Sequence, residues 1–297
     1  MRVFLTGATG YIGSAVLDAF VRAGHDVTAL VRSQAAAERV AHRTGKWIVG
    51  DLAAPETYVP RAAGFDAYVH TAFEPSARGA EVDAAAVDAL LGLARPSAQA
   101  VVYTSGVWVL GPTQGADESA PVNPVAISAH RPALEARVLE ANGAGLRAAV
   151  VRPGIVFGGG RGIVGDLIKD AENGVMRVIG NGENHWPLVY DRDLADLFVR
   201  ILASPDASGV YHAADDSTER VVDVVEAIAS SVGQRPEIRY MPIAEARNKL
   251  GPYADAITLD QIVRSPRSKA LGWQPSLGSL VRNVPRLVEE WRNARKG

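Results

Sequence analysis

The sequence has no cysteine among its 297 residues and only three methionines. Without thiols the protein forms no disulfides, uses no thiolate nucleophile and holds no metal on thiolate ligands. Its six histidines are scattered, and none form a pair at the spacing of a helical metal site. The sequence therefore predicts no metal site, and its chemistry must come from other side chains or from a bound cofactor.

Long hydrophobic runs and an excess of one charge are also lacking. No stretch approaches the roughly 18 consecutive apolar residues of a membrane-spanning helix, and the chain opens on a predicted strand instead of a basic and then apolar leader. The 31 basic residues nearly balance the 33 acidic ones, and both kinds are spread along the chain. We therefore expect no nucleic-acid partner, no membrane partner and a cytoplasmic location.

What the sequence does contain is a glycine-rich turn near its start. Residues 2–6 are a short run of strand formers, Gly7, Gly10 and Gly13 follow at spacings of three, and a helical apolar pattern comes next. Gly7 would make the turn, Gly10 would admit phosphates, and Gly13 would let the helix and strand pack closely. The pattern predicts a site for the pyrophosphate of a dinucleotide at a helix N-terminus. A purely structural turn is the alternative.

Strands and helices alternate through the first half of the chain. The predicted strands are residues 2–6, 27–31, 47–50, 66–70, 100–104 and 146–151. This alternation predicts an α/β fold with a doubly wound parallel sheet, whose ligands lie beyond the carboxyl ends of the strands. We expect the ligand at the switch point between the first and fourth strands. The residues at these strand ends are Gly7, Arg32, Asp51, Thr71 and Ser105.

The end of the second strand bears on the choice of cofactor. In dinucleotide-binding sheets an acidic residue at this position holds the 2′-hydroxyl of the adenosine ribose. Here Arg32 stands at that end, and Asp26 lies at the opposite end. Because a guanidinium suits a 2′-phosphate, we predict NADP as the cofactor, with NAD as the alternative.

The pattern changes after the sixth strand. We predict a dinucleotide-binding core over residues 1–157 and, mainly, a small α/β substrate lobe over residues 158–297, with some strands returning to the core. The expected elements of the second part are helices at 163–173, 191–202, 221–232 and 277–291, and strands at 186–190, 209–212 and 237–240. Asp191 is the expected N-cap of its helix.

Seven motifs in this order resemble the extended and atypical short-chain dehydrogenases/reductases, the NAD(P)-dependent epimerase/dehydratase group. The motifs are TGATGYIG at 6–13, DL at 51–52, VHTA at 69–72, TSG at 104–106, RPGIVFG at 152–158, VYDRDLA at 189–195 and SKALGW at 268–273. Each motif is common alone, and together they span nearly the whole chain. The resemblance implies a Rossmann fold with a C-terminal substrate lobe.

The resemblance also implies roles for residues at matching positions. It places Thr9, Tyr11 and Ile12 with the three glycines at the pyrophosphate, and Asp51 and Leu52 at the adenine. Ser105 matches the family's catalytic serine, which hydrogen-bonds the substrate oxygen. The residues implied at the ribose and nicotinamide are Thr71, Ala72, Phe73, Pro153, Gly154 and Ile155.

One part of the family's catalytic apparatus is missing. The family uses a Tyr followed four residues later by a Lys, and no Tyr in this chain has a Lys at that distance. Alignment on Glu135 places Ile127 at the Tyr position and Arg131 at the Lys position. Ile127 cannot transfer a proton, and Arg131 stays charged at any relevant pH.

Several residues are candidates for the missing proton donor. His130 lies three residues after Ile127 and titrates in a useful range, although Pro132 predicts that the helix begins near Arg131. Tyr190 and His185 flank Trp186 in a segment that faces substrate in the resembled family, and both are also candidate substrate contacts. Arg131 is a candidate for ordering the ribose or for binding an anionic substrate group.

The aromatic residues and the helix pair predict partners. A pocket of Phe73, Trp108, Phe157, Trp186 and Tyr190 would suit an apolar or aromatic carbonyl compound. We therefore expect an NADP-dependent oxidoreductase; a nucleotide-sugar epimerase or dehydratase and a catalytically silent NADP-binding regulator are the alternatives. Apolar faces on the predicted helices at 80–94 and 128–142 predict a homodimer.

Overall fold

The centre of the protein is a seven-stranded parallel sheet. The computed structural model describes residues 1–95 and 99–295. The strand order is β11-β7-β5-β4-β1-β2-β3, and every neighbouring pair is parallel. The α/β prediction with a doubly wound sheet is confirmed. The strands are β1 Arg2–Thr6, β2 Asp26–Val31, β3 Trp47–Val49, β4 Ala67–His70, β5 Ala100–Thr104, β7 Arg147–Pro153 and β11 Gly209–Ala213.

The sheet reverses its direction of growth beside β1. From β1 the chain adds β2 and β3 on one side, and then returns to add β4, β5, β7 and β11 on the other. The switch point therefore lies between β1 and β4, where the sequence predicts it. At a switch point the two connections leave the strand ends in opposite directions, and a crevice opens between them.

Helices cover both faces of the sheet because successive strand side chains point to opposite sides. Val3 and Leu5 of β1 lie in one buried cluster, and Phe4 lies in another. The first cluster is covered by α1 (Tyr11–Arg22), α2 (Gln34–Thr44) and α6 (Asp191–Ala203), and the second by α3 (Gly79–Ala94) and α4 (Arg131–Leu139).

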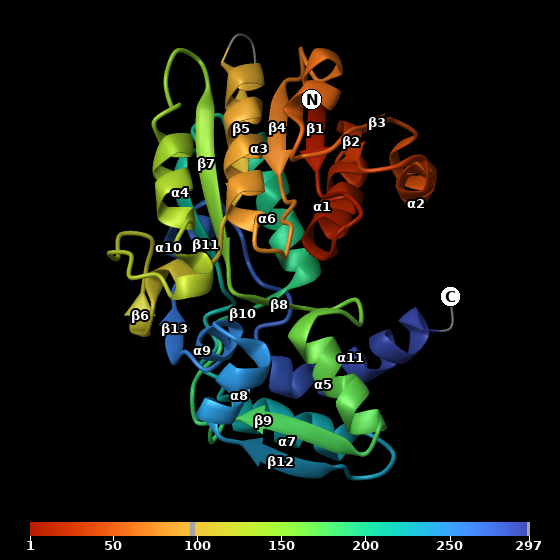
Figure 1. The fold of residues 1–297 in the computed structure, drawn as a ribbon, viewed down its shortest axis with the longest axis vertical. Helices are drawn as coiled ribbons and strands as arrows, with labels where there is room; N and C mark the ends of the chain where they lie inside the picture. Colours follow the sequence, from red (N-terminus) through yellow and green to blue (C-terminus); the bar gives the residue numbers. More distant parts are fainter. Residues whose placement is uncertain (96–98, 296–297) are drawn as a thin grey trace.

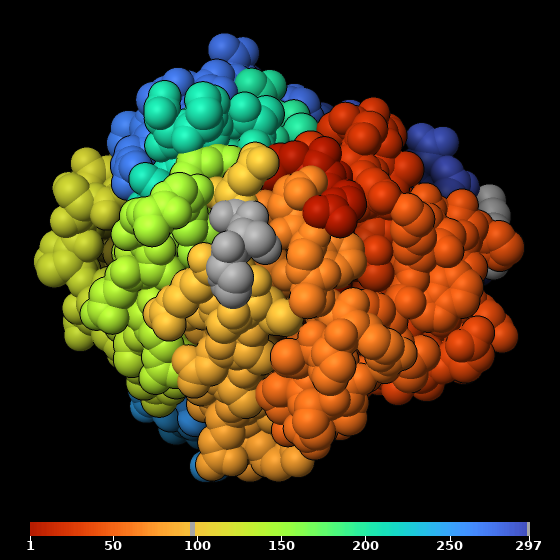
Figure 2. Space-filling view, turned by 90° about the horizontal axis from the view of Figure 1, so that it is seen from above, coloured from red at the N-terminus to blue at the C-terminus, as the bar shows by residue number. Residues whose placement is uncertain are grey.

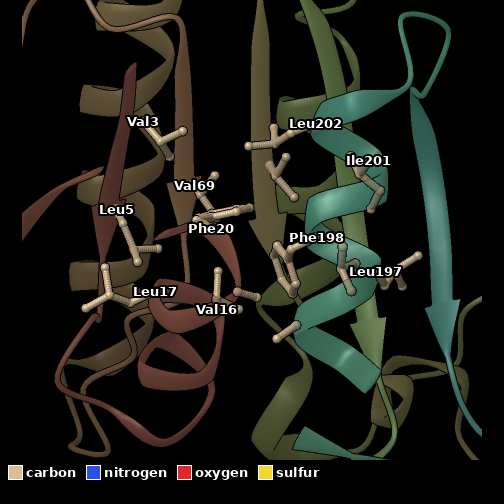
Figure 3. Packing of buried hydrophobic residues seen from close by; sticks show 14 of the residues in the cluster. Val3, Leu5, Val16, Leu17, Phe20, Val69, Leu197, Phe198, Ile201 and Leu202 are labelled. Atoms are coloured by element: carbon tan, nitrogen blue, oxygen red, sulfur yellow. The ribbon is translucent and has the colours of Figure 1, made fainter. Parts of the chain in front are cut away.

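Helix α6 returns from the second half of the chain to the central sheet. It packs on α1, and its Leu197, Phe198, Ile201 and Leu202 meet side chains of α1, β1 and β4, as Figure 3 shows. Strand β11 also returns and extends the sheet beside β7. Helix α6 and strand β11, both from beyond residue 157, therefore belong to the sheet core, and Trp273 is buried in the same cluster.

The remaining elements form a smaller lobe at one end of the molecule (Figure 1), built on a separate buried cluster. Seen from the opposite end, the surface is mostly made of the first 150 residues, with later segments along one edge (Figure 2). The elements of this part are α5 Gly162–Glu172, α7 Val221–Ser231, α8 Ile243–Leu250, α9 Tyr253–Ile257 and α11 Leu280–Ala294, with strand pairs β8 Ile155–Phe157/β10 Leu188–Tyr190, β9 Val175–Ile179/β12 Glu237–Met241 and β6 Thr113–Ala116/β13 Gln261–Val263. Helix α10 Pro266–Ala270 instead packs against β11 of the central sheet.

Some helix boundaries differ from those expected. The helix expected at 128–142 is α4, which begins at Arg131 because Pro132 fits only a first turn. Asp191 is the first residue of α6 and not its N-cap; Tyr190 holds that position and makes no side-chain cap. Helix α2 was not predicted, because alanine supplies most of its apolar face. Among the described residues, no helix has the length and apolar character needed to cross a membrane.

Phe198 tests whether α6 belongs to the same cooperative core as the sheet. Its side chain is fully buried. We expect Phe198→Ala to lower the free energy of unfolding by about 3–5 kcal/mol, because the truncation leaves a cavity under α6. Chemical denaturation should show one transition, shifted as a whole. Val21→Ala on the exposed side of α1 is the control, with a change of about 0.5 kcal/mol or less. A Phe198→Ala loss no larger than this control would contradict the packing.

The buried carboxyl group of Asp191 should make the free energy of unfolding depend on pH. Burial, joined by the nearby acidic Glu290 and Asp193, raises the pKa of Asp191 from 3.8 to about 6. The folded protein then holds this proton more tightly than the unfolded chain, so the free energy of unfolding falls as the pH rises from 3.8 to about 6. We expect Asp191→Asn to be about 1–3 kcal/mol more stable than wild type at pH 8 and similar to it at pH 4. Denaturation at both pH values measures this, and an equal effect at the two values would refute it.

Candidate functional site

A cavity of about 580 Å³ lies at the carboxyl ends of the central strands. It brings together residues that are far apart in the sequence. Most of the predicted site residues line it: Gly7, Thr9, Gly10, Tyr11, Ile12, Arg32, Asp51, Leu52, Thr71, Ala72, Phe73, Ser105, Trp108, Arg131, Pro153, Gly154 and Ile155. The residues that line it follow the carboxyl ends of β2 and β3, then of β1 and β4, and then of β5 and β7.

The glycine turn is held against the end of β4 by close backbone approach. Gly7 has φ +77°, and a Cβ there would lie 2.6 Å from the amide nitrogen of Ala72. A Cβ on Gly13 would overlap the carbonyl oxygen of Gly7 and Oγ1 of Thr71. Only glycine permits this packing. Gly13 therefore lies behind the turn and does not line the cavity.

The first turn of α1 faces the cavity without a cap. Gly10 is the N-cap residue, no side chain accepts from the turn, and no acidic residue occupies it. The free N–H groups and the positive end of the helix dipole favour an anion at this position. This arrangement fits the pyrophosphate site that the glycine spacing predicts.

Arg161 also reaches this turn, and sequence reasoning missed it. Its guanidinium lies 5.2 Å from the ring centre of Tyr11, and Nη1 donates to the carbonyl oxygen of Gly10 at 3.4 Å. Tyr11 in turn donates to the carbonyl oxygen of Gly158 at 2.7 Å. Burial raises the pKa of the Tyr11 hydroxyl far above its ordinary value, so it stays protonated. The loop before α5 thus closes over the glycine turn and adds a positive charge there.

Arg32 stands at the carboxyl end of β2, on the cavity wall. Its side chain is exposed, and among the described residues it makes no hydrogen bond or ion pair. Helix α2 begins two residues later, where Ser33 accepts from the amide of Ala36. Asp26, at the other end of the strand, pairs with Lys46 at 2.6 Å. No acidic side chain therefore occupies the position that would bind a ribose 2′-hydroxyl.

Ser105 directly follows β5 and belongs to a buried polar network. Its hydroxyl donates to Oε1 of Glu135. Arg152 forms a two-armed ion pair with the same carboxylate, with Nη2 2.5 Å from Oε2 and Nε 3.1 Å from both oxygens. Arg152 Nη1 lies 3.5 Å from Nε2 of His212. Glu135, Arg152 and His212 are each no more than 5% exposed.

His212 is the last member of this polar network, and its imidazole is neutral. Burial and the adjacent Arg152 lower the pKa of His212 to about 4. Its Nδ1 lies 3.1 Å from the carbonyl oxygen of Arg264, to which it donates, so Nε2 accepts from Arg152. Arg152 and His212 therefore hold Glu135 in place, and Glu135 fixes the rotamer of Ser105. The sequence predicted a role for Ser105 but no such role for Glu135, Arg152 or His212.

His130 belongs to a second polar cluster behind the cavity wall. Its Nε2 lies 3.4 Å from Oδ2 of Asp83, whose oxygens also accept from His70 at 3.0 Å and Tyr103 at 2.7 Å. Burial alone would raise the pKa of Asp83, but the hydrogen bonds from His70 and Tyr103 hold it below its ordinary value. Desolvation and the adjacent Arg131 lower the pKa of His130. His130 does not line the cavity, although its ring stacks on Phe73, which does.

Arg131 and Ile127 line the cavity beside Ser105. Nη1 of Arg131 donates to the carbonyl oxygen of Thr104 at 2.9 Å, and its guanidinium lies 5.2 Å from the ring centre of Phe73. Trp108 forms the neighbouring wall and meets Tyr253 of α9 edge to face. A cation and an apolar side chain thus line the cavity side by side at residues 131 and 127.

Besides His130, four predicted substrate or proton-donor residues lie outside the cavity. Phe157, Trp186 and Tyr190 are packed in the core of the smaller lobe, where each is no more than 4% exposed. The hydroxyl of Tyr190 donates to Glu290, and burial together with Glu290 raises its pKa to about 12. His185 pairs with Asp260 at 2.7 Å. The alternating pattern of residues 186–190 does not distinguish a pocket wall from a strand buried on both faces.

Comparison with known proteins agrees with the predicted resemblance. The family model described as "NAD dependent epimerase/dehydratase family" matches residues 3–214 of this chain. The Schizosaccharomyces pombe protein "Uncharacterized protein C2A9.02" is 31% identical over 96% of this chain and 98% of its own. A "4-hydroxy-2-methyl-3-oxo-4-farnesyl-3,4-dihydroquinoline-1-oxide ketoreductase" from Stigmatella aurantiaca is 37% identical over 53% of this chain and 51% of its own.

The fold agrees as well. The crystal structure of human "epimerase family protein SDR39U1 (isoform2) with NADPH" superposes with a TM-score of 0.81 at 23% identity, covering 97% of this chain and 99% of the other. The family match extends from β1 through β11, and so includes the glycine turn, Ser105 and the Arg152–Gly154 segment. On the strength of that match, this chain belongs to the NAD dependent epimerase/dehydratase family.

Proposed function

We propose that this protein binds NADP(H) in the cavity and reduces a small, largely apolar carbonyl compound by hydride transfer. The observation that carries the proposal is Arg32 at the end of β2, a cation that pairs with no side chain in the described part of the chain and lies on the wall of the same cavity as Ser105. The ketoreductase name of one relative supports the direction of the reaction.

The adenosine end of the cavity fits NADP better than NAD. A 2′-phosphate at the end of β2 would meet the guanidinium of Arg32 and the N-terminus of α2, both of which favour negative charge. The pyrophosphate would lie on the uncapped first turn of α1, with Arg161 beside it. The NADPH in the solved human structure supports this choice. NAD is the alternative cofactor.

The residues at the other end would orient and polarise the substrate. When bound, the cofactor supplies the hydride, and the carbonyl oxygen gains negative charge as the carbon accepts it. Ser105 lines this end of the cavity, and its hydroxyl, once turned from Glu135 toward the substrate, would donate to the developing charge. Ile127 cannot donate a proton, so we propose that water entering the open cavity supplies it.

The apolar wall suggests the character of the substrate. Val107, Trp108, Ile127 and Ile163 surround the space beside Ser105. These side chains would bury a hydrocarbon or aromatic group next to the carbonyl. This set replaces Phe157, Trp186 and Tyr190, which are held in the core.

Two other functions are weaker hypotheses. The family name favours a nucleotide-sugar epimerase or dehydratase, but that chemistry needs a strong base, and Ile127 stands where the family has its tyrosine. A catalytically silent NADP-binding regulator would also fit the altered pair. A homodimer through α3 and α4 and a cytoplasmic location both remain predictions.

Arg32 decides the cofactor prediction. We expect Arg32→Ala to weaken NADPH binding about 10-fold to 100-fold and to leave NADH binding unchanged, because only NADPH carries the 2′-phosphate. Fluorescence titration with both cofactors measures this. Arg22→Ala, an exposed arginine at the end of α1, is the matched control. Equal losses for NADPH and NADH in Arg32→Ala would contradict the role.

Ser105 tests the proposed chemistry. We expect Ser105→Ala to lower kcat about 10²-fold to 10³-fold, because the hydroxyl that would turn from Glu135 to donate to the developing charge is lost. The dissociation constant for NADPH should not change. The readout is NADPH consumption with a carbonyl panel, and Ser119→Ala, whose exposed hydroxyl bonds only to Asp117, is the control. Full activity in Ser105→Ala would refute the assignment.

A further inference from the structure

Arg131 is the one charged side chain on the substrate half of the cavity, among the residues described. The other charged residues on the wall are Arg32, Asp51 and Glu74. Arg32 and Asp51 lie at the ends of β2 and β3, and Glu74 lies close enough to Arg32 to feel its charge. Around Arg131 the wall is instead formed by Val107, Trp108 and Ile127 and by the hydroxyls of two serines.

Two contacts fix the plane of the Arg131 guanidinium. Nη1 donates to the carbonyl oxygen of Thr104 at 2.9 Å. One face lies against the ring of Phe73, 5.2 Å from its centre, and the other side of that ring stacks on His130 at 6.0 Å. A guanidinium anchored by one N–H and stacked on an aromatic ring loses little further freedom when it binds a ligand.

The remaining edge of this guanidinium has no protein acceptor. Over residues 1–95 and 99–295, Arg131 donates only through Nη1, and no carboxylate oxygen lies within 4.0 Å of it. Asp83 is near enough to interact electrostatically, but its oxygens already accept from His70 and Tyr103. The parallel N–H bonds of Nε and Nη2 are thus left as a rigid two-pronged donor in an apolar part of the cavity.

A carboxylate is the group that this donor fits. It offers two acceptor oxygens at the spacing of the guanidinium fork and brings the missing counter-charge. Ribose hydroxyls are neutral, and a single donor such as the lysine of the family serves them equally well. Partly buried cations without a partner are costly, so a ligand charge is the expected complement.

We propose that Arg131 binds the carboxylate of the substrate, and that the substrate is an oxo acid with an apolar tail. This inference rests on the proposed carbonyl reduction. Arg131 is anchored on Thr104, the residue next to Ser105, so one short molecule can place its carboxylate at Arg131 and its carbonyl at Ser105. A separation of one or two carbons between the two groups, as in 2-oxo and 3-oxo acids, suits this neighbourhood.

Matched acid and ester substrates test the inference. The probes are 2-oxooctanoate and 3-oxooctanoate with their methyl esters, each reduced with saturating NADPH. We expect kcat/KM of the wild type to favour an acid over its ester at least 10-fold, and Arg131→Ala to remove this preference by losing activity on the acid alone. Arg131→Lys, which keeps the charge without the fork, should retain part of the preference. Arg137→Ala, on the exposed side of the same helix and paired with Asp88, is the control and should behave as wild type.

A binding measurement covers the case in which neither probe is turned over. With NADPH present, octanoate should raise the unfolding temperature of the wild type and of Arg137→Ala more than octan-1-ol does, and this difference should vanish in Arg131→Ala.

Two results would overturn the inference. One is an acid-to-ester ratio and an octanoate shift unchanged by Arg131→Ala. The other is an Arg131→Ala protein that loses NADPH affinity with the same acid-to-ester ratio, which would place Arg131 at the ribose. Failure of the proposed function itself is distinguishable, because the wild type would then not bind NADPH in the first titration.

Discussion

The close approach of the glycine turn to the end of β4 is the constraint on which the site depends. A side chain at Gly7 would run into the backbone of Ala72, and one at Gly13 would run into Gly7 and Thr71. With glycine at both positions, α1 begins at the switch point with its first turn open to the cavity. The same packing draws Thr71 and Ala72 onto the cavity wall. The geometry of the cofactor end therefore follows from missing side chains as much as from those present.

A second constraint acts at the other end of the cavity. Ser105 is positioned by Glu135, and Glu135 is held by Arg152 within a core that excludes water. A buried ion pair of this kind adds little net stability, but it fixes a rotamer and is costly to break. By our proposal, Ile127 and Arg131 stand beside it in place of the family's tyrosine and lysine. The two ends together describe a site organised around anions, with phosphates at one end and, by our proposal, a carboxylate at the other.

Local signals predicted the fold and most of the residues that line the cavity. Strand ends can be located from apolar runs, and the carboxyl ends of parallel strands meet at one edge, so Gly7, Arg32 and Ser105 could be placed together before the structure was known. Contacts that form only when distant segments pack together could not be predicted from these local signals. Glu135 reaches Ser105, and Arg152 reaches Glu135, only through tertiary packing. Arg161 reaches Tyr11 only because its loop folds back on the first turn. Trp186 and Tyr190 show the opposite problem. The sequence predicted that they line a pocket, but they are buried in the smaller lobe, because a strand covered on both faces has the same composition as a pocket wall.

The most direct test of the central claim is a crystal structure of the protein grown with NADP⁺. The account predicts the pyrophosphate on the first turn of α1, the 2′-phosphate against Arg32 and the N-terminus of α2, and the nicotinamide beside Ser105. A dinucleotide bound with its adenosine away from the end of β2, or a cavity that stays empty at saturating NADP⁺, would contradict it.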